Sequence, residues 1–340
     1  MAKGARVVWI DYAKVIGIFL VVLGHAYPWP DTQLSVKAII YQFHMPLFFF
    51  VSGALHKSSG FIANAASAWR RMLLPAALWM LIYLCVSFIF ETRSGNISLL
   101  VVLTNLSVDT FSKIARGEPT FPCFVIWYCI ALTWCRLIFS AVHNKLHQHV
   151  IRWIFFLLAL LCIADYVPYF FFGHALLALP FYVSGFFSTS ACICSRRADV
   201  QALLIIALVS LVCILMWNLY VPYGITNMAT MSFGNYLPFK LNWAAGYIVG
   251  AVGIIFSVTV CKILASKRFA FITEMSNATF VILVSHLLLL IMGSKLCSII
   301  LPDNTGDVKY WLNAFITTIA GGVLYIVLKK TRLYALIGYR

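Results

Sequence analysis

The sequence predicts an all-α fold, a polytopic bundle of about ten transmembrane helices with both chain termini in the cytoplasm. The composition supports this class, because 63% of the 340 residues are hydrophobic and only 10% are charged, against about 25% charged residues in soluble proteins. Apolar stretches of about 20 residues recur along the chain, each long enough to cross a hydrocarbon core. The connections are short, so residues 1–340 are predicted to form a single integral-membrane domain.

The predicted spans follow one another with short connections. We place them at residues 7–27, 36–55, 72–90, 121–141, 151–165, 167–190, 201–221, 241–262, 275–300 and 311–328. The segment 96–111 is apolar but short and is interrupted by polar residues, which favours an interfacial or re-entrant helix over another span. The first span contains Asp11 and Lys14 and no cleavage site follows it, so we expect a retained span rather than a signal peptide.

Basic residues set the predicted orientation. A formal net charge of +15 would suggest a nucleic-acid partner in a soluble protein. Here most Lys and Arg residues lie in alternate connections, so the positive-inside rule explains the charge and places both termini in the cytoplasm. Most cysteines lie within spans as small apolar side chains. Cys192 and Cys194 lack a second pair at zinc spacing, so we expect no metal.

The first span carries a stripe of polar side chains. Asp11 and Lys14 are three residues apart, so they can pair on one helical face. Lys14 and His25 are eleven residues apart, which is three turns plus about 20°, so both project from one face about 16 Å apart. Ionisable groups are costly inside a bilayer, which makes all three candidate functional residues. The alternatives are an interfacial ion pair for Asp11 and Lys14 and a headgroup-level position for His25.

The second predicted span contains the stretch FHMPLFFFVSG and runs inward. His44 therefore lies toward the outer half, at a depth that matches the outer end of the first span. Pro46 removes a backbone donor and can kink the helix, and carbonyl groups freed in this way are tolerated where they line a cavity. Ser52 and Gly53 lie near the cytoplasmic end. The alternatives are an interhelical hydrogen bond for His44 and close helix packing for Gly53.

Later spans contain five further candidates. Arg70 and Arg71 open the third span at its cytoplasmic end, where they can contact phosphate groups or only set the topology. Trp127 and Tyr128 are candidates for a substrate cavity, and aromatic anchoring at the membrane interface is the alternative. His286 lies deep in the ninth span, where a histidine needs a partner for a structural or a catalytic role.

Several of these motifs belong together. The first span has the pattern D-x-x-K-x(10)-H and is followed by FHMPLFFFVSGAL and RMLLP. Together they resemble the membrane acyltransferase-3 family, in particular its fucose 4-O-acetylase-like sugar O-acetyltransferases. The stretches WYCIAL, FYVSGFF and SNATFVILVSH are similar to further family motifs, so the resemblance spans most of the chain. The chain has Lys14 where the family usually has Arg, and Leu283 and Val284 where it usually has Tyr-Leu.

The resemblance implies acetyl transfer from cytoplasmic acetyl-CoA to a hydroxyl of a lipid-linked or cell-surface glycan, at the bacterial inner membrane. Acetyl-CoA would be a substrate, and no metal is implied. The residues are compatible with this chemistry: His25 can act as a general base, Lys14 can hold the donor or stabilise negative charge, and Asp11 can orient Lys14. Donor binding is expected at Ser52, Gly53, Arg70 and Arg71, and a substrate cavity at His44, Pro46, Trp127, Tyr128 and His286.

A glycan or metabolite transporter, or a flippase, without acyl transfer is the alternative hypothesis. A midplane Asp–Lys pair and a Pro-broken helix would suit transport, but no paired halves with matching Gly or Pro interruptions occur. A sensor or scaffold predicts neither turnover nor flux. Thioester consumption separates these classes. Direct transfer and a two-step route through an acetyl group on His25 both fit the residues, and an oligomer is compatible with them.

Overall fold

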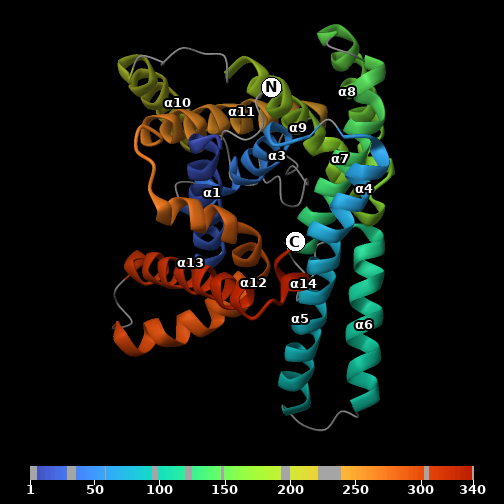
Figure 1. Cartoon of the computed structure of the whole chain (residues 1–340), viewed down its shortest axis with the longest axis vertical. Coiled ribbons are helices and arrows are strands. Elements are labelled where there is room, and N and C mark those ends of the chain that lie inside the picture. The colour runs from blue at the N-terminus through green and yellow to red at the C-terminus, as the bar shows by residue number, and fades with distance from the viewer. Residues whose placement is uncertain are drawn as a thin grey trace. The chain divides into compact units, whose positions relative to one another are not determined.

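The computed structural model describes residues 6–28, 36–57, 59–93, 99–118, 125–146, 149–192, 200–220, 239–301 and 306–338. Within these ranges all regular secondary structure is helical (Figure 1). Cys194 of the C-x-C pair lies outside them. The chain forms two compact units. The first unit combines Met1–Ala54 with Gly185–Val327, and the second combines Leu55–Ser184 with Leu328–Arg340.

The first unit is built around its N-terminal helix. Its elements are α1 (Val8–Ala26), α2 (Val36–Tyr41), α3 (His44–Ala54), α10 (Val200–Tyr220), α11 (Phe239–Leu264), α12 (Ala270–Ile300) and most of α13 (Asp307–Lys330). Helix α1 packs against α2, α3, α11 and α12, and α10 lies along α11 (Figure 1). Ile18, Val22 and Leu23 of α1 are completely buried, as expected for a helix that is apolar on most of its circumference.

The second unit contains a long helical hairpin. Its elements are α4 (Phe61–Ala68), η1 (Trp69–Leu73), α5 (Leu74–Arg93), α6 (Leu99–Arg116), α7 (Ile126–Leu146), α8 (Val150–Ile163), η2 (Ala164–Tyr166), η3 (Tyr169–Phe171), most of α9 (Phe172–Cys192) and α14 (Tyr334–Ile337). Helices α5 and α6 lie side by side (Figure 1). Helix α4 packs against α7, and α14 packs against α5. The Trp79 indole donates a hydrogen bond of 3.0 Å to the Leu336 carbonyl.

Eight of the described helices are long and apolar enough to cross a membrane, so the chain is an integral membrane protein. The candidate spans are Val8–Ala26, Phe61–Ile89, Ile126–Leu146, Tyr169–Ser188, Val200–Trp217, Ala244–Leu264, Ala270–Ile300 and Asp307–Lys330. Each overlaps one predicted span. The remaining two predictions fall on shorter helices, because 36–55 is divided between α2 and α3 and α8 has only 14 residues. The count of ten spans and the orientation stay predictions.

The second predicted span is interrupted beside its proline. Helix α2 ends at Tyr41 and α3 begins at His44, so the break falls on Gln42 and Phe43. Pro46 cannot donate to the carbonyl four residues earlier, which belongs to Gln42, and its ring crowds that carbonyl. The proline therefore accounts for the position of the break.

The segment predicted as a non-spanning helix forms α6, which starts three residues later and extends to Arg116. Its polar side includes an ion pair between Lys113 and Asp109 at 2.7 Å. Among the described helices, α6 is not one of the candidate spans. Its placement at the membrane interface stays a prediction.

Candidate active site

The polar stripe of α1 faces α12. The Lys14 ammonium donates a hydrogen bond of 2.6 Å to the carbonyl of Ser276. Three turns further along α1, the His25 ring lies 5.0 Å from the ring of His286, measured between centroids. The second contact lies eleven residues further along α1 and ten residues further along α12 than the first, so the two helices run in the same direction. The prediction that Lys14 and His25 share a helical face agrees with these contacts.

At the start of the stripe, Arg6 is the ion-pair partner of Asp11, and the charges of Asp11 and Lys14 also attract each other. Arg6 binds both carboxylate oxygens of Asp11, at 2.6 and 2.8 Å, and the Ser276 hydroxyl donates to the same carboxylate at 2.7 Å. The planar guanidinium of Arg6 matches the two oxygens better than an ammonium does. Lys14 donates to the Ser276 carbonyl. Asp11 and Lys14 therefore both contact Ser276, and the role of Asp11 in orienting Lys14 stays a prediction.

Three histidines and a tyrosine gather near the end of the stripe. The Tyr41 hydroxyl lies 3.4 Å from His25 Nδ1. The Tyr41 ring meets the His25 ring edge-on at 6.0 Å and the His44 ring edge-on at 4.9 Å. His44 and His286 are buried, and His25 is partly buried. We call these four residues, His25, Tyr41, His44 and His286, the histidine cluster.

Backbone carbonyls select the tautomer of two of these histidines. His44 Nδ1 is 2.9 Å from the Ile40 carbonyl, and His286 Nδ1 is 2.6 Å from the Leu283 carbonyl. A carbonyl only accepts, so each neutral ring carries its hydrogen on Nδ1 and a lone pair on Nε2. Nε2 of His286 is buried and has no hydrogen-bond partner among the described residues. This ring nitrogen is equipped to accept a proton.

The other predicted residues of the second span lie along α3. Pro46 and Gly53 are buried, and Ser52 is partly buried. Gly185, which ends the later FYVSG motif, lies against this helix, because a side chain at Gly185 would overlap the carbonyl oxygen of Phe50. Close packing therefore explains the glycine of the second Ser-Gly pair.

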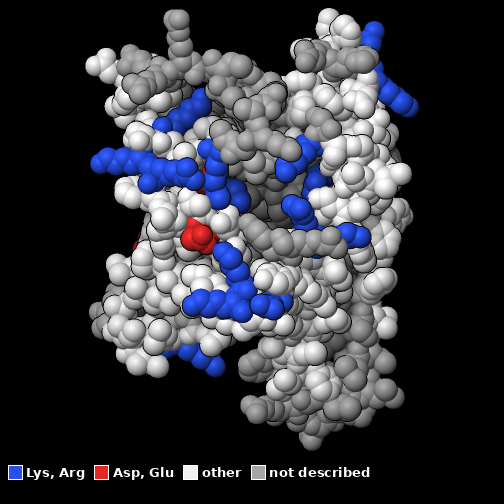
Figure 2. Space-filling view, in the orientation of Figure 1, with Lys and Arg blue, Asp and Glu red and all other residues white. Residues whose placement is uncertain are grey.

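The remaining predicted residues belong to the second unit. Arg70 and Arg71 are exposed and lie in η1, a single turn of π-helix, a distortion that is frequent at functional sites. Trp127 and Tyr128 are buried near the start of α7, and the Trp127 ring lies 5.7 Å from that of His174. Lys and Arg outnumber Asp and Glu on the face drawn in Figure 2. The donor and cavity roles of these residues stay predictions.

The second unit also contains a histidine outside the spans. His56 Nδ1 lies 2.7 Å from the Tyr182 hydroxyl. Burial, together with the nearby charges of Arg136 and His143, lowers the pKa of His56 to about 4. Its ring is therefore neutral near pH 7. Among the described residues, no three His, Cys, Asp or Glu side chains gather in a way that could hold a metal ion.

Sequence reasoning missed three residues of the first unit: Arg6, Tyr41 and Ser276. Arg6 precedes the first predicted span. Tyr41 precedes His44 by three residues, but the helix breaks between them, so helical spacing did not indicate their contact. Ser276 precedes His286 by ten residues, close to the interval between Lys14 and His25. This matching interval was the available signal for a pairing of the two spans.

These features define an integral membrane protein of helices with a histidine cluster inside one helical unit. A family model described as an acyltransferase domain, acyltransferase-3, matches residues 7–328. The chain therefore belongs to the acyltransferase-3 family and is a membrane acyltransferase, which confirms the predicted family. No curated protein and no solved structure matches the chain.

Proposed function

We propose that the protein moves an acetyl group from cytoplasmic acetyl-CoA to a hydroxyl of a lipid-linked or cell-surface glycan, at the bacterial inner membrane. The family match supports acyl transfer in general. The observation that carries the site assignment is the contact of His25 with His286 at 5.0 Å, on the same side of α1 as Lys14. These contacts bring two imidazole groups and the Lys14 ammonium to the interface between α1 and α12.

The proposed chemistry begins with proton removal. A sugar hydroxyl is a poor nucleophile while protonated, so His25 accepts its proton as a general base. The hydroxyl oxygen attacks the thioester carbon, and the tetrahedral intermediate then loses the thiolate of CoA. The imidazolium returns its proton to that thiolate, which gives the ester and free CoA. This role needs the tautomer in which His25 Nδ1–H donates to the Tyr41 oxygen and the lone pair is on Nε2.

Lys14 supplies positive charge in the proposed mechanism. Its ammonium is directed to the Ser276 carbonyl, and it holds the donor or stabilises negative charge that develops during transfer. Asp11 acts as a positioning residue, because it holds the Ser276 hydroxyl. Lys14 and His25 are about 16 Å apart along α1, so the pantetheine arm is proposed to follow the α1–α12 interface toward His25.

The remaining candidate residues are proposed to bind the two substrates. Arg70 and Arg71 are exposed, with guanidinium groups suited to the phosphates of CoA. Ser52 and Gly53 are assigned to the donor side. Trp127, Tyr128, His44, Pro46 and His286 are assigned to the acceptor cavity.

The experiment uses purified protein, labelled acetyl-CoA and membranes that contain the acceptor glycan. His25→Ala is expected to slow transfer by about 10²–10⁴-fold, the usual effect of a general base. His149→Ala is the matched control, because this histidine is exposed and precedes α8, and its activity stays at the wild-type level. Wild-type turnover in His25→Ala would exclude His25 as the base.

Two further measurements separate the alternatives. Absence of thioester consumption by the wild-type protein would contradict acyl transfer and favour a transporter. Acid quenching during turnover, followed by peptide mass analysis, detects an acetyl group on His25 if transfer takes two steps. A direct transfer leaves His25 unmodified at all times.

A further inference from the structure

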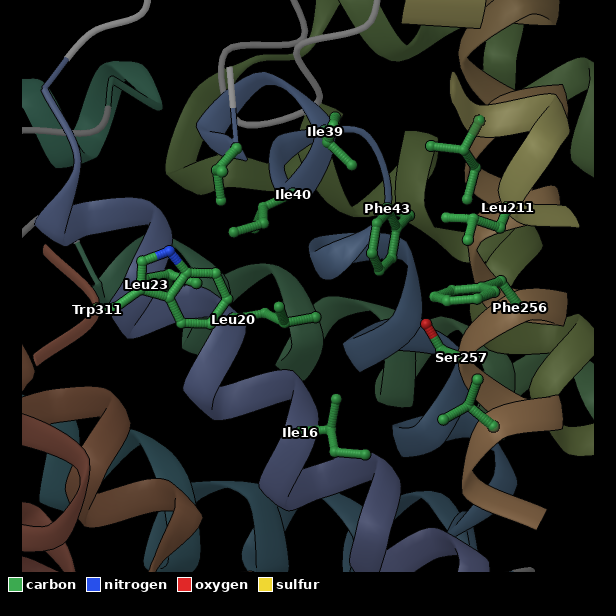
Figure 3. Close-up of a pocket in the computed structure, with 13 residues that line it drawn as sticks. Ile16, Leu20, Leu23, Ile39, Ile40, Phe43, Leu211, Phe256, Ser257 and Trp311 are labelled. Carbon is green, nitrogen blue, oxygen red and sulfur yellow. The ribbon is translucent and has the colours of Figure 1, made fainter. Parts of the chain in front are cut away.

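The first unit contains an apolar cavity on the other side of α1 from the histidine cluster. Ile16, Leu20 and Leu23 line it, and at 100° per residue they point roughly opposite to Lys14 and His25. The cavity measures about 270 Å³. Figure 3 shows side chains of α1, α2 and α11 directed into the same space. The full lining is Ile16, Leu20, Leu23, Val36, Ile39, Ile40, Phe43, Leu211, Ile214, Phe256, Ser257, Val260 and Trp311.

The lining selects for hydrocarbon. Ser257 is the single hydroxyl residue in the lining, and its hydroxyl already donates to the Gly253 carbonyl at 2.8 Å. A nucleotide, a sugar or a charged peptide would lose its hydrogen bonds to water here without replacement, which is unfavourable. A dry apolar cavity of about 150 Å³ is large enough to bind benzene. This larger cavity has room for a longer apolar ligand.

The lining of the cavity extends along α1. Ile16 and Leu23 are seven residues apart, which corresponds to about 10 Å along the helix axis and accommodates several carbons of a hydrocarbon chain. Four of the surrounding helices, α1, α10, α11 and α13, are candidate spans. Leu204 and Leu208 of α10 are exposed, and α10 is a candidate span, so we expect lipid around this helix. We therefore expect the ligand of this cavity to be a hydrocarbon chain of a lipid in the bilayer.

The cavity and the histidine cluster share a wall. Ile40 lines the cavity, and its carbonyl accepts the hydrogen bond of His44 Nδ1. Leu23 lines the cavity two residues before His25. The acetyl group itself reacts at His25, on the other side of the α1 backbone, so the donor's own acyl chain does not explain this cavity. A lipid chain bound in the cavity would contact α1 and α2, and both helices also contribute residues to the histidine cluster.

We propose that this cavity binds the hydrocarbon tail of a lipid-linked acceptor, which rests on the proposed function and selects the lipid-linked form of the glycan. The tail anchors the acceptor against α1 and α2 while its polar part reaches the histidine cluster. An ordinary phospholipid chain in the same place is the competing occupant, and the experiment below distinguishes the two.

The test is photolabelling of the purified protein in lipid nanodiscs. One probe is a long-chain isoprenoid phosphate with a diazirine in its tail, and the other is a phospholipid with a diazirine in its acyl chain, at equal mole fraction. The isoprenoid probe is expected to label peptides of α1, α10 or α11. Equal labelling of these peptides by the phospholipid, or no labelling by the isoprenoid, would overturn the proposal.

Two matched variants locate the label. Ile214→Phe fills the cavity, because Ile214 lines it and is 1% exposed, whereas Ile205→Phe makes the same change on the opposite, exposed side of α10. Overpacking of this kind weakens binding by about tenfold, so labelling falls about tenfold in Ile214→Phe and is unchanged in Ile205→Phe. Leu20→Phe is the second filling variant if Ile214→Phe does not fold. Equal labelling in filled and control variants would contradict the assignment.

Failure of this proposal and failure of the proposed function give different results. If the protein transfers acetyl groups but the filled variants turn over lipid-linked acceptor with an unchanged KM, the cavity is not the tail site. If the isoprenoid probe labels the cavity but no acetyl-CoA is consumed, the cavity binds lipid and the proposed acetyl transfer from acetyl-CoA is contradicted.

Discussion

Asp11 is a carboxylate with 6% of its surface exposed, inside a predicted span. It is tolerated there because Arg6 binds both oxygens and the Ser276 hydroxyl binds one of them. A buried charge that loses its partner is much more costly than an exposed one. Arg6 itself is partly exposed, with 34% of its side-chain surface accessible. Water therefore weakens its ion pair with Asp11 and can hydrate the carboxylate when Arg6 is removed.

The Arg6–Asp11 pair gives a prediction on stability. Arg6→Ala is expected to destabilise the protein by about 1–3 kcal/mol, because it leaves the Asp11 carboxylate with the Ser276 hydroxyl but without its cation. The double variant Arg6→Ala with Asp11→Asn is expected to lose less than the sum of the two single losses. Thermal unfolding in detergent measures all three. Additive losses would show that the two side chains are not coupled.

His56 gives a prediction on pH. Burial, with the charges of Arg136 and His143, lowers its pKa from 6.5 to about 4. Between these values the unfolded chain binds a proton at His56 that the folded chain does not, so the free energy of unfolding falls as the pH falls through this window.

The measurement compares the unfolding temperature of wild type and His56→Gln from pH 7 to pH 4. The difference between the two proteins is expected to shrink or reverse toward low pH, because the variant lacks this proton. His149→Gln is the control, since that residue is exposed. A constant difference over the whole range would contradict the argument.

At the residue scale, the sequence predicted the types of polar residue but not all their partners. Helical spacing was sufficient to place Lys14 and His25 on one face. It was not sufficient to choose between Arg6 and Lys14 as the partner of Asp11, because both lie within reach along the chain. The Asp11 carboxylate also accepts a hydrogen bond from Ser276, which is 265 residues away. Local spacing contains no information about such a contact.

At the scale of elements, the C-terminal segment of the second unit closes against η1. Gly338 has a left-handed backbone with φ of +67°, and a side chain there would overlap the carbonyl oxygen of Arg71. Because the obstacle is backbone rather than a flexible side chain, it cannot move away without displacing η1 or the segment after α14. Gly338 thus determines how closely this segment approaches the two arginines.

The prediction is that Gly338→Ala lowers the free energy of unfolding by about 1–3 kcal/mol and raises the KM for acetyl-CoA if Arg70 and Arg71 bind the donor. Gly306→Ala is the matched control, because Gly306 also has a positive φ, +55°, but an added side chain there meets nothing within 4 Å. Unfolding temperatures and donor KM values are measured for both. Equal losses would assign the effect to backbone strain alone.

Elements were predictable where a long apolar stretch is uninterrupted, as for α11 and α13. The sequence also indicated a kink near Pro46, but the break at Gln42 and Phe43 follows from the crowding of a particular carbonyl. The start of α4 at Phe61, well before the predicted third span, was missed. Helix α4 is short and rich in small residues, so hydropathy alone did not extend the predicted span from α5 into α4.

At the scale of the whole molecule, the number of spans determines whether the two termini lie on the same side of the membrane. Eight candidate spans and ten predicted spans are both even numbers, so either count puts the two termini on the same side. The distribution of Lys and Arg predicts that this side is the cytoplasm. We expect a green fluorescent protein fused to either terminus to fluoresce.

The complementary reporter is alkaline phosphatase, which is active only outside the cytoplasm. It is expected to be inactive at both termini. The ten predicted spans place three spans before Arg116, at the end of α6, so a reporter inserted there is expected to be active, whereas the eight candidate spans place only two before it and an inactive insertion would favour that count. An active fusion at one terminus and an inactive one at the other would mean an odd number of spans.

The pairing of α1 with α12 also has a consequence for biosynthesis. Ser276 is translated 262 residues after Lys14, which takes roughly 10–50 s at about 5–20 residues per second. Arg6 can neutralise Asp11 as soon as both have left the ribosome, whereas Lys14 has to wait in the bilayer for its carbonyl. A nascent chain that stops before α12 therefore lacks the carbonyl that Lys14 binds in the folded protein, and we expect such a fragment to be less stable in the membrane.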